Sequence, residues 1–165
     1  MGSAPLPPDG SAIARETDML ARPRRRSSAR VPGNPVRYFW YSSAKDQSEQ
    51  LKGLLRRLKT GGIRDENVTI LSPLAPDRAC ASQLDGVSTQ SGQPSTRVTV
   101  TSISAFKGLE SDVVVLTDVE KIDGPWWKSV LYVGMSRARS VLFVFVSRDC
   151  KAEYETRLRE YIETG

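Results

Sequence analysis

The chain has 165 residues and a net charge of +5, and it contains no histidine. This length suits one ordinary domain with its own core, and the lack of histidine excludes His-based zinc sites and Ser-His-Asp hydrolysis. The two cysteines, Cys80 and Cys150, do not have the spacing of metal ligands, so we expect no bound metal. We also expect a cytoplasmic protein, because no apolar run is long enough to span a membrane and no apolar signal core follows the N-terminus.

The first 35 residues carry much of the positive charge, with six arginines against three acidic residues. They are also rich in proline, glycine and serine, a composition typical of disorder. We therefore predict a disordered basic tail or linker over residues 1–35 and one α/β domain over residues 36–165. The arginine-rich run at residues 22–26 is either a nucleic-acid arm or a solvated tail that keeps the protein soluble.

The ordered part is predicted to begin with a strand and a helix. Residues 36–41 are rich in β-branched and aromatic side chains, which favours a strand. Ser43 is the predicted N-cap of a helix, because its hydroxyl can accept a hydrogen bond from a free backbone N–H. Leucines at helical spacing extend this helix to about Lys59, and Gly61-Gly62 ends it.

The rest of the domain alternates between strands and helices. Periodicity and turn residues predict, in chain order, a buried strand at 67–72, a helix or helical turn at 76–84, a loop at 85–96, strands at 97–103 and 112–117, a helix from Gly124, a strand at 141–146 and a final helix capped by Asp149. The final helix is predicted to face inward with Tyr154, Leu158 and Tyr161. Alternating strands and helices imply βαβ units and a mostly parallel sheet.

The first segment that carries chemistry runs from Thr101 to Glu110. A strand ends here, the chain turns at Lys107-Gly108, and a short helix is predicted near Leu109-Glu110. Gly108 lets the backbone approach a ligand closely, and amides at a helix start attract anions. Lys107 adds a point charge suited to phosphate, and Glu110 can accept a hydrogen bond from a ribose hydroxyl.

The second segment, Leu131 to Arg139, ends an amphipathic helix and leads into a buried strand. We expect Arg137 to stand at the carboxyl edge of the sheet. The planar guanidinium of an arginine can reach a transferring phosphoryl group across a domain cleft. The alternative for Arg137 is a surface ion pair with a carboxylate, and Arg139 is interpreted as a structural or DNA-backbone residue.

Together, the two segments resemble motifs V and VI of superfamily 1 helicases of the UvrD/PcrA branch. The shared pattern is a Ser/Thr-rich strand end, Lys107-Gly-Leu-Glu110, an apolar strand, and Leu131-Tyr-Val-Gly-Met-Ser-Arg-Ala-Arg139 before another apolar strand. The resemblance implies the second RecA-like (P-loop NTPase-type) domain, with three layers and a mostly parallel sheet. It also implies that this chain lacks the Walker A half of the ATP site.

The resemblance further implies a role for each matching residue. Arg137 would contact the γ-phosphate, Glu110 the ribose, and Lys107 with Gly108 would lie near the phosphates. Ser102 and Ser104 occupy positions where family members often carry Thr and His that face single-stranded DNA. Ser104 departs from that pattern, because it keeps a hydrogen-bonding group but lacks the imidazole.

A Walker A loop needs a Gly-Lys-Ser/Thr end, and this chain contains no Gly-Lys dipeptide. We therefore expect ATP with Mg to bind only together with a first RecA-like domain, supplied in cis or in trans, and expect no ATP hydrolysis by this chain alone. The expected partner strand is single-stranded DNA, or RNA as the alternative. The competing interpretations are a solo, non-catalytic module that binds a protein or a single strand, and an independent nucleotide-binding domain.

Trp126 and Trp127 start the predicted helix that leads into the second segment. Adjacent tryptophans at a helix start are typical of packing, and base stacking is the alternative.

Overall fold

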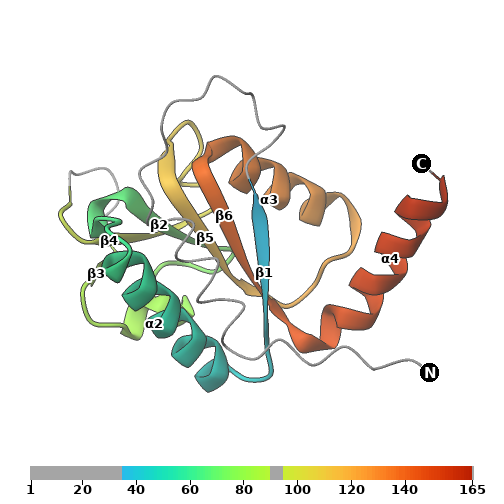
Figure 1. The fold of residues 1–165 in the computed structure, drawn as a ribbon, viewed down its shortest axis with the longest axis horizontal. Helices are drawn as coiled ribbons and strands as arrows, with labels where there is room; N and C mark the ends of the chain where they lie inside the picture. The colour runs from blue at the N-terminus through green and yellow to red at the C-terminus, as the bar shows by residue number, and fades with distance from the viewer. Residues whose placement is uncertain (1–34, 90–94, 165) are drawn as a thin grey trace.

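The computed structural model describes residues 35–89 and 95–164. The tail predicted for residues 1–35 lies outside the described residues, except for Pro35. Within the described part, one sheet of six strands forms the middle of the domain (Figure 1). Its strands are β1 (Val36–Tyr41), β2 (Val68–Ser72), β3 (Val87–Ser88), β4 (Val98–Ser102), β5 (Ser111–Val119) and β6 (Ala138–Ser147).

All neighbouring strands of the sheet are parallel, in the order β1-β6-β5-β2-β4-β3. This confirms the predicted α/β class, and the sheet is entirely rather than mostly parallel. The two-residue strand β3 lies inside the segment predicted to be a loop, where Val87 pairs with Val98. β2 is buried throughout and β5 is buried except at Asp112 and Asp118, as continuous apolar runs predict.

Three α-helices complete the domain: α2 (Ala44–Thr60), α3 (Gly124–Arg137) and α4 (Lys151–Thr164). Ser43 caps α2 as predicted, since its Oγ accepts a hydrogen bond from the Asp46 amide at 3.1 Å. The predicted cap at Asp149 is wrong: its amide donates to Ser147 Oγ, and a 3₁₀ turn, η3 (Arg148–Cys150), precedes α4. Of the helix or helical turn predicted at 76–84, the structure has the turn, the 3₁₀ turn η2 (Cys80–Gln83). Another such turn, η1 (Asp65–Asn67), precedes β2.

The helices cover the two faces of the sheet and give three layers. Side chains alternate between faces along a strand, so Val113 and Val115 pack toward α2, while Val114 and Leu116 pack toward α3. The leucines predicted to form the apolar stripe of α2 lie in the first core, and Trp127 and Val130 of α3 lie in the second. The three-layer arrangement is therefore the predicted one.

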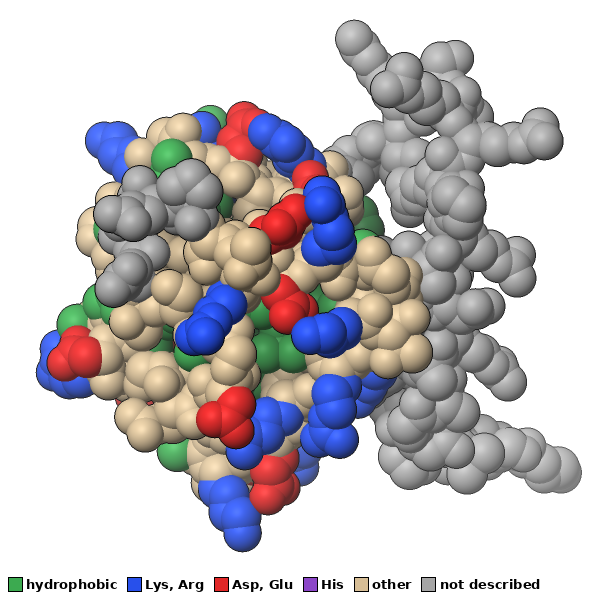
Figure 2. Space-filling view, turned by 90° about the vertical axis from the view of Figure 1, so that its left-hand side faces the viewer, with side chains coloured by type: hydrophobic (Ala, Val, Ile, Leu, Met, Phe, Trp, Pro, Cys, Tyr) green, Lys and Arg blue, Asp and Glu red, His purple; other side chains and the backbone are tan. Residues whose placement is uncertain are grey.

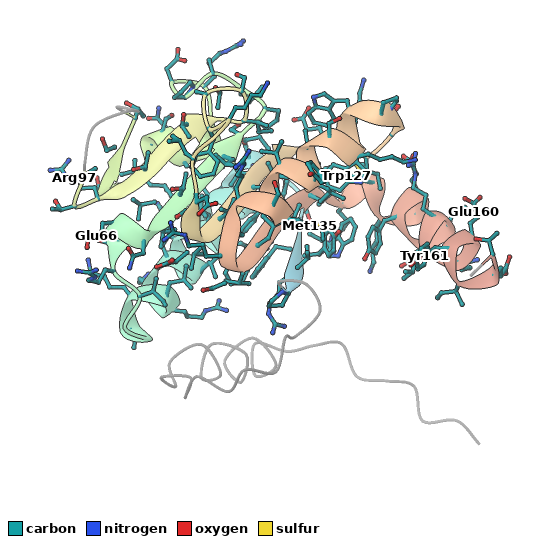
Figure 3. The ribbon with its side chains drawn as sticks, turned by 90° about the horizontal axis from the view of Figure 1, so that it is seen from above. Glu66, Arg97, Trp127, Met135, Glu160 and Tyr161 are labelled. Atoms are coloured by element: carbon teal, nitrogen blue, oxygen red, sulfur yellow. The ribbon has the colours of Figure 1, made fainter. Side chains whose placement is uncertain are left out.

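Helix α4 differs from its predicted packing. Its Tyr154 contacts two aromatic rings of β1, with ring centroids 5.0 Å from Tyr38 and 5.3 Å from Trp40. Leu158 and Tyr161 were predicted to face inward, but they are 45% and 77% exposed. The reason is that α4 runs away from the sheet after its first turns, so its far end has no layer to cover (Figures 1 and 3). No described helix is long and apolar enough to cross a membrane.

Candidate functional site

The two sequence segments that carry chemistry lie side by side. β5 and β6 are neighbours, and Ser111 at the start of β5 pairs with Ala138 at the start of β6. Glu110 and Arg137 directly precede these two residues, so they stand next to each other at the amino edge of the sheet. An ion pair joins the same segments, because Arg139 Nε lies 3.1 Å from Glu110 Oε2.

Arg137 stands at the opposite edge from the one predicted. It is the last residue of α3, and the Ala138 amide donates to the Gly134 carbonyl as the helix ends. A helix that joins two parallel strands returns the chain to the amino end of the sheet, and therefore the end of α3 lies there. The expectation of a carboxyl-edge arginine is wrong for this reason.

The side chain of Arg137 is half-buried, and none of the described residues forms an ion pair with it. Arg139, by contrast, contacts two acids, since its Nη1 also lies 3.9 Å from Asp112 Oδ1. This pairing fits the structural interpretation of Arg139, and a DNA-backbone role stays the alternative. The two arginines therefore differ: among the described residues, carboxylates pair with the guanidinium of Arg139 but not with that of Arg137.

The helix predicted at Leu109-Glu110 is absent. Residues 103–108 form turns instead, and β5 begins at Ser111, whose hydroxyl donates to the Asn67 carbonyl at 2.9 Å. The buried ring of Phe106 anchors the turns, with its amide donating to the Ser102 carbonyl at 3.2 Å. The argument from helix-start amides therefore does not apply, because strand β5 begins directly after Glu110.

Gly108 has the backbone conformation that its predicted role requires. Its φ is +87°, where L side chains are strained, and nothing lies within 4 Å of the place a Cβ would occupy. Lys107 and Glu110 beside it are exposed. Arg139 binds Glu110 at Oε2 only, so Oε1 can still accept a hydroxyl hydrogen bond. Lys107, Gly108 and Glu110 are thus exposed in the last part of this segment, and nucleotide binding by them stays a prediction.

Ser102 and Ser104 lie at the other end of the domain. Ser102 ends β4 at the carboxyl edge, and its Oγ lies 3.1 Å from Ser104 Oγ. Residues 103–110 carry the chain from this edge back to the amino edge, a span of about 20 Å at the usual rise of a strand. The predicted DNA-facing and nucleotide-facing residues are therefore not brought together, but one short segment joins them.

A pocket of about 270 Å³ opens beside these serines. We call it the Trp126 pocket, and it is lined by Pro73, Ser102, Ile103, Ser104, Trp126, Ser129, Val130 and Val133. The tryptophan pair divides here, since Trp127 is 6% exposed in the core while Trp126 is 46% exposed. The packing interpretation therefore holds for Trp127 alone.

A second hollow, of about 370 Å³, lies between α2 and the β3 region. Lys52, Arg56 and Lys59 line it, but so do Asp65 and Asp85, and Lys59 pairs with Asp65 at 3.0 Å. Figure 2 shows basic and acidic side chains interspersed on the side of the domain that it faces, not gathered into one basic patch. This hollow therefore lacks the single-sign charge typical of a phosphate-binding groove.

A polar cluster around Asp118, at the carboxyl end of β5, was missed by the sequence analysis. The carboxylate accepts hydrogen bonds from Ser72 Oγ at 2.7 Å, Gln47 Nε2 at 3.0 Å and the Cys80 amide at 3.3 Å. The Asp118 amide donates back to Gln47 Oε1 at 2.8 Å. Its φ is +59°, and the pairing of β5 with β6 is irregular between Leu116 and Val119. The cluster ties α2, β2 and η2 to β5, and the aspartate that ends an apolar run was its only sequence signal.

Burial, together with the nearby Asp118 carboxylate, raises the pKa of the Cys80 thiol to about 12. Cys150 is also a free cysteine, and burial raises its pKa as well. Raised values keep both thiols protonated, which suits inert packing residues and not nucleophiles. Within the described residues, no group of three or more acidic, cysteine or histidine side chains is placed to hold a metal ion.

No protein-family model matches the sequence, and no curated protein matches it. The fold is similar to the crystal structure of the C-terminal domain of a possible DNA helicase from Lactobacillus plantarum WCFS1, with a TM-score of 0.53. That match covers 81% of this chain and 83% of the other at 14% sequence identity. At this identity the likeness concerns the fold alone, and the chain is therefore an all-parallel α/β domain that resembles a helicase C-terminal domain.

Proposed function

We propose that this chain is the second RecA-like domain of an ATP-dependent, UvrD-like DNA helicase or translocase. The observation that carries the proposal is the junction at the starts of β5 and β6, where Ser111 pairs with Ala138 and Arg139 pairs with Glu110. Two segments far apart in sequence meet there, each with the residues that its motif requires. A chance match to either motif would not explain their adjacency.

Arg137 is the residue that contacts the γ-phosphate from across the cleft. Its guanidinium has no acidic partner among the described residues, so it keeps its hydrogen-bond donors for a ligand. Lys107 supplies a point charge, Gly108 an accessible backbone, and Glu110 an acceptor for the ribose. ATP with Mg, when bound, supplies the phosphoryl group that is transferred. A first RecA-like domain, in cis or in trans, must hold the rest of that ligand, because the chain has no Walker A loop.

The segment at residues 103–110 couples the nucleotide to the single strand. It begins beside Ser102 and Ser104 and ends at Glu110, on the opposite edge of the sheet. Buried Phe106 anchors its middle in the second core, so a shift at one end is resisted by packing and passed along the segment. Closure of the two domains around ATP would then move the serines that face the strand.

The test is DNA-stimulated ATP turnover by this chain combined with its first RecA-like domain. We expect Arg137→Ala to lower turnover by roughly 10³-fold or more, the size typical of an arginine that stabilises phosphoryl transfer. Arg137→Lys should recover only part, because an ammonium lacks the planar fork. Arg159→Ala, at an exposed site on α4, is the matched control. Full turnover by Arg137→Ala would show that the arginine has no such role.

A second candidate is a solo, non-catalytic module that binds a protein or a single strand. The observation that favours it is the pairing of Glu110 with Arg139, which already engages one oxygen of the predicted ribose ligand. This candidate predicts no ATP dependence with any first domain. It also predicts that the basic residues 1–35 contribute salt-sensitive binding to a single strand. An unchanged affinity after deletion of these residues would show that they do not contribute. Heat on addition of millimolar ATP to the chain alone would instead support an independent nucleotide-binding domain.

A further inference from the structure

We propose that the Trp126 pocket takes one unpaired base of a single-stranded nucleic acid, stacked on the Trp126 indole. This inference rests on the proposed contact between the strand and the serines at the carboxyl edge, and it names the chemistry that is recognised there. The hydroxyls of Ser102 and Ser104 alone could only position the nucleic-acid backbone. The pocket adds an aromatic surface and an apolar wall beside them.

Trp126 is the first observation behind the proposal. Its side chain is 46% exposed, while its neighbour Trp127 already fills the core beneath α3. None of the aromatic contacts among the described residues involves Trp126. A large indole left at a pocket wall, with no other ring against it, is available to stack on a flat ligand.

The pocket walls fit a base in their chemistry. Ile103, Val130 and Val133 line it with apolar side chains that can cover a ring. Ser102 and Ser104 share one hydrogen bond of 3.1 Å, and a hydroxyl pair of this kind keeps one O–H to donate and lone pairs to accept. The edge of any base presents donors and acceptors to such a pair. Stacking supplies the affinity without a preference for one base.

The charge around the pocket is also compatible with a phosphate backbone. No acidic side chain lines it, in contrast to the hollow beside α2, where Asp65 and Asp85 would repel phosphates. The Trp126 pocket is therefore the better candidate for a nucleic acid of the two hollows. A strand that enters it would meet the serines where residues 103–110 begin the crossing toward the nucleotide edge.

The experiment compares an oligothymidine with an abasic oligonucleotide of the same length, both at one fixed salt concentration. The abasic strand has the same phosphates but no rings, so it measures phosphate binding, including any by the basic residues 1–35. Fluorescence anisotropy of the labelled strand gives the affinity of the full chain and of Trp126→Ala, Trp126→Phe and Tyr132→Ala. Tyr132 is the matched control, because it is an exposed aromatic residue on the same helix but outside the pocket.

We expect Trp126→Ala to weaken oligothymidine binding about 5- to 140-fold, the loss that corresponds to one stacked base. Its affinity for the abasic strand should not change. Trp126→Phe should keep most of the affinity, because a ring remains, and Tyr132→Ala should bind both strands as the parent chain does. An oligouridine in parallel would show whether the pocket accepts RNA as well as DNA.

Several outcomes would overturn the proposal: no binding of oligothymidine by the full chain, an unchanged affinity in Trp126→Ala, or an equal loss on the abasic strand. An equal loss from Tyr132→Ala would do the same. Since no ATP is present, failure here is separate from failure of the ATP-coupled function, which Arg137→Ala tests. If the Trp126 pocket does not bind a base but Arg137→Ala lowers ATP turnover, only the base-binding inference is refuted.

Discussion

Replacing Asp118 by alanine should lower the free energy of unfolding by about 3 kcal/mol. The carboxylate accepts hydrogen bonds from Ser72 Oγ, Gln47 Nε2 and the Cys80 amide. Each donor left without a partner in a buried site costs about 1 kcal/mol. The φ of +59° observed here costs an L residue about 1 kcal/mol, but aspartate already bears this cost, so alanine adds nothing to it.

The matched variant Asp118→Gly separates the two contributions. Glycine adopts the left-handed conformation without strain and so recovers about 1 kcal/mol that aspartate and alanine both lose. Its net loss should therefore be about 2 kcal/mol. Urea unfolding followed by circular dichroism measures both values, and the slope with denaturant should stay constant if only stability changes. Asp77→Ala, at an exposed site, is the control for removal of a carboxylate.

The reasoning is refuted if Asp118→Gly is as stable as the parent chain. That result would mean that the three donors find other partners, and that the cluster does not hold α2 and η2 to β5. If the alanine and glycine variants lose the same free energy of unfolding, the lost hydrogen bonds still explain the decrease. The positive φ of residue 118 would then have no measurable energetic cost.

Three further predictions concern stability and the junction of the two motif segments. The pKa of the Cys80 thiol is raised to about 12, so the stability linked to this group is present below the ordinary thiol pKa and is lost as pH rises toward 12. At one pH unit above the ordinary thiol pKa, the free energy of unfolding should fall by about 1 kcal/mol. Urea midpoints measured across alkaline pH test this, and constant midpoints would contradict it. Gly134→Val should cost about 1–3 kcal/mol, because a Cβ at Gly134 would lie 3.1 Å from the Leu142 side chain; thermal unfolding measures it, and an unchanged midpoint would show that the core adapts. Arg139→Ala should cost less than about 1 kcal/mol, because its pair with Glu110 is exposed, and a larger loss in the same assay would indicate a role beyond this pair.

Much of the fold could be predicted from the sequence because its signals are local. Continuous β-branched runs identified β5 and β6, leucine spacing identified α2, and Ser43 capped that helix as predicted. The final helix was predicted correctly as an element, but not in its packing. Its apolar spacing gave no information on where the sheet ends, so the exposure of Tyr161 was not foreseen.

The residues of the candidate site stay a prediction from the sequence, and their geometry was not predicted. Whether Arg137 lies at the amino or the carboxyl edge depends on the path of the chain between strands, which no local pattern records. The strand at Ser111 replaced the expected helix because the β-branched run that follows outweighs the weak helix signal of two residues. The Asp118 cluster joins residues from four elements, and such non-local hydrogen bonds have no spacing rule.

The strand order also has a consequence for how the protein is made. β1 carries the aromatic residues Tyr38 to Tyr41, and its one strand partner in the described sheet is β6, which leaves the ribosome long after it. Until β6 emerges, both edges of this aromatic strand are unpaired, and unpaired strand edges are templates for aggregation. A nascent chain that stalls before Ser147 would be the species that most needs a chaperone. The sheet is thus complete only when its last strand, residues 138–147, has been made and pairs with β1. Until then the earlier part of the chain is prone to aggregate.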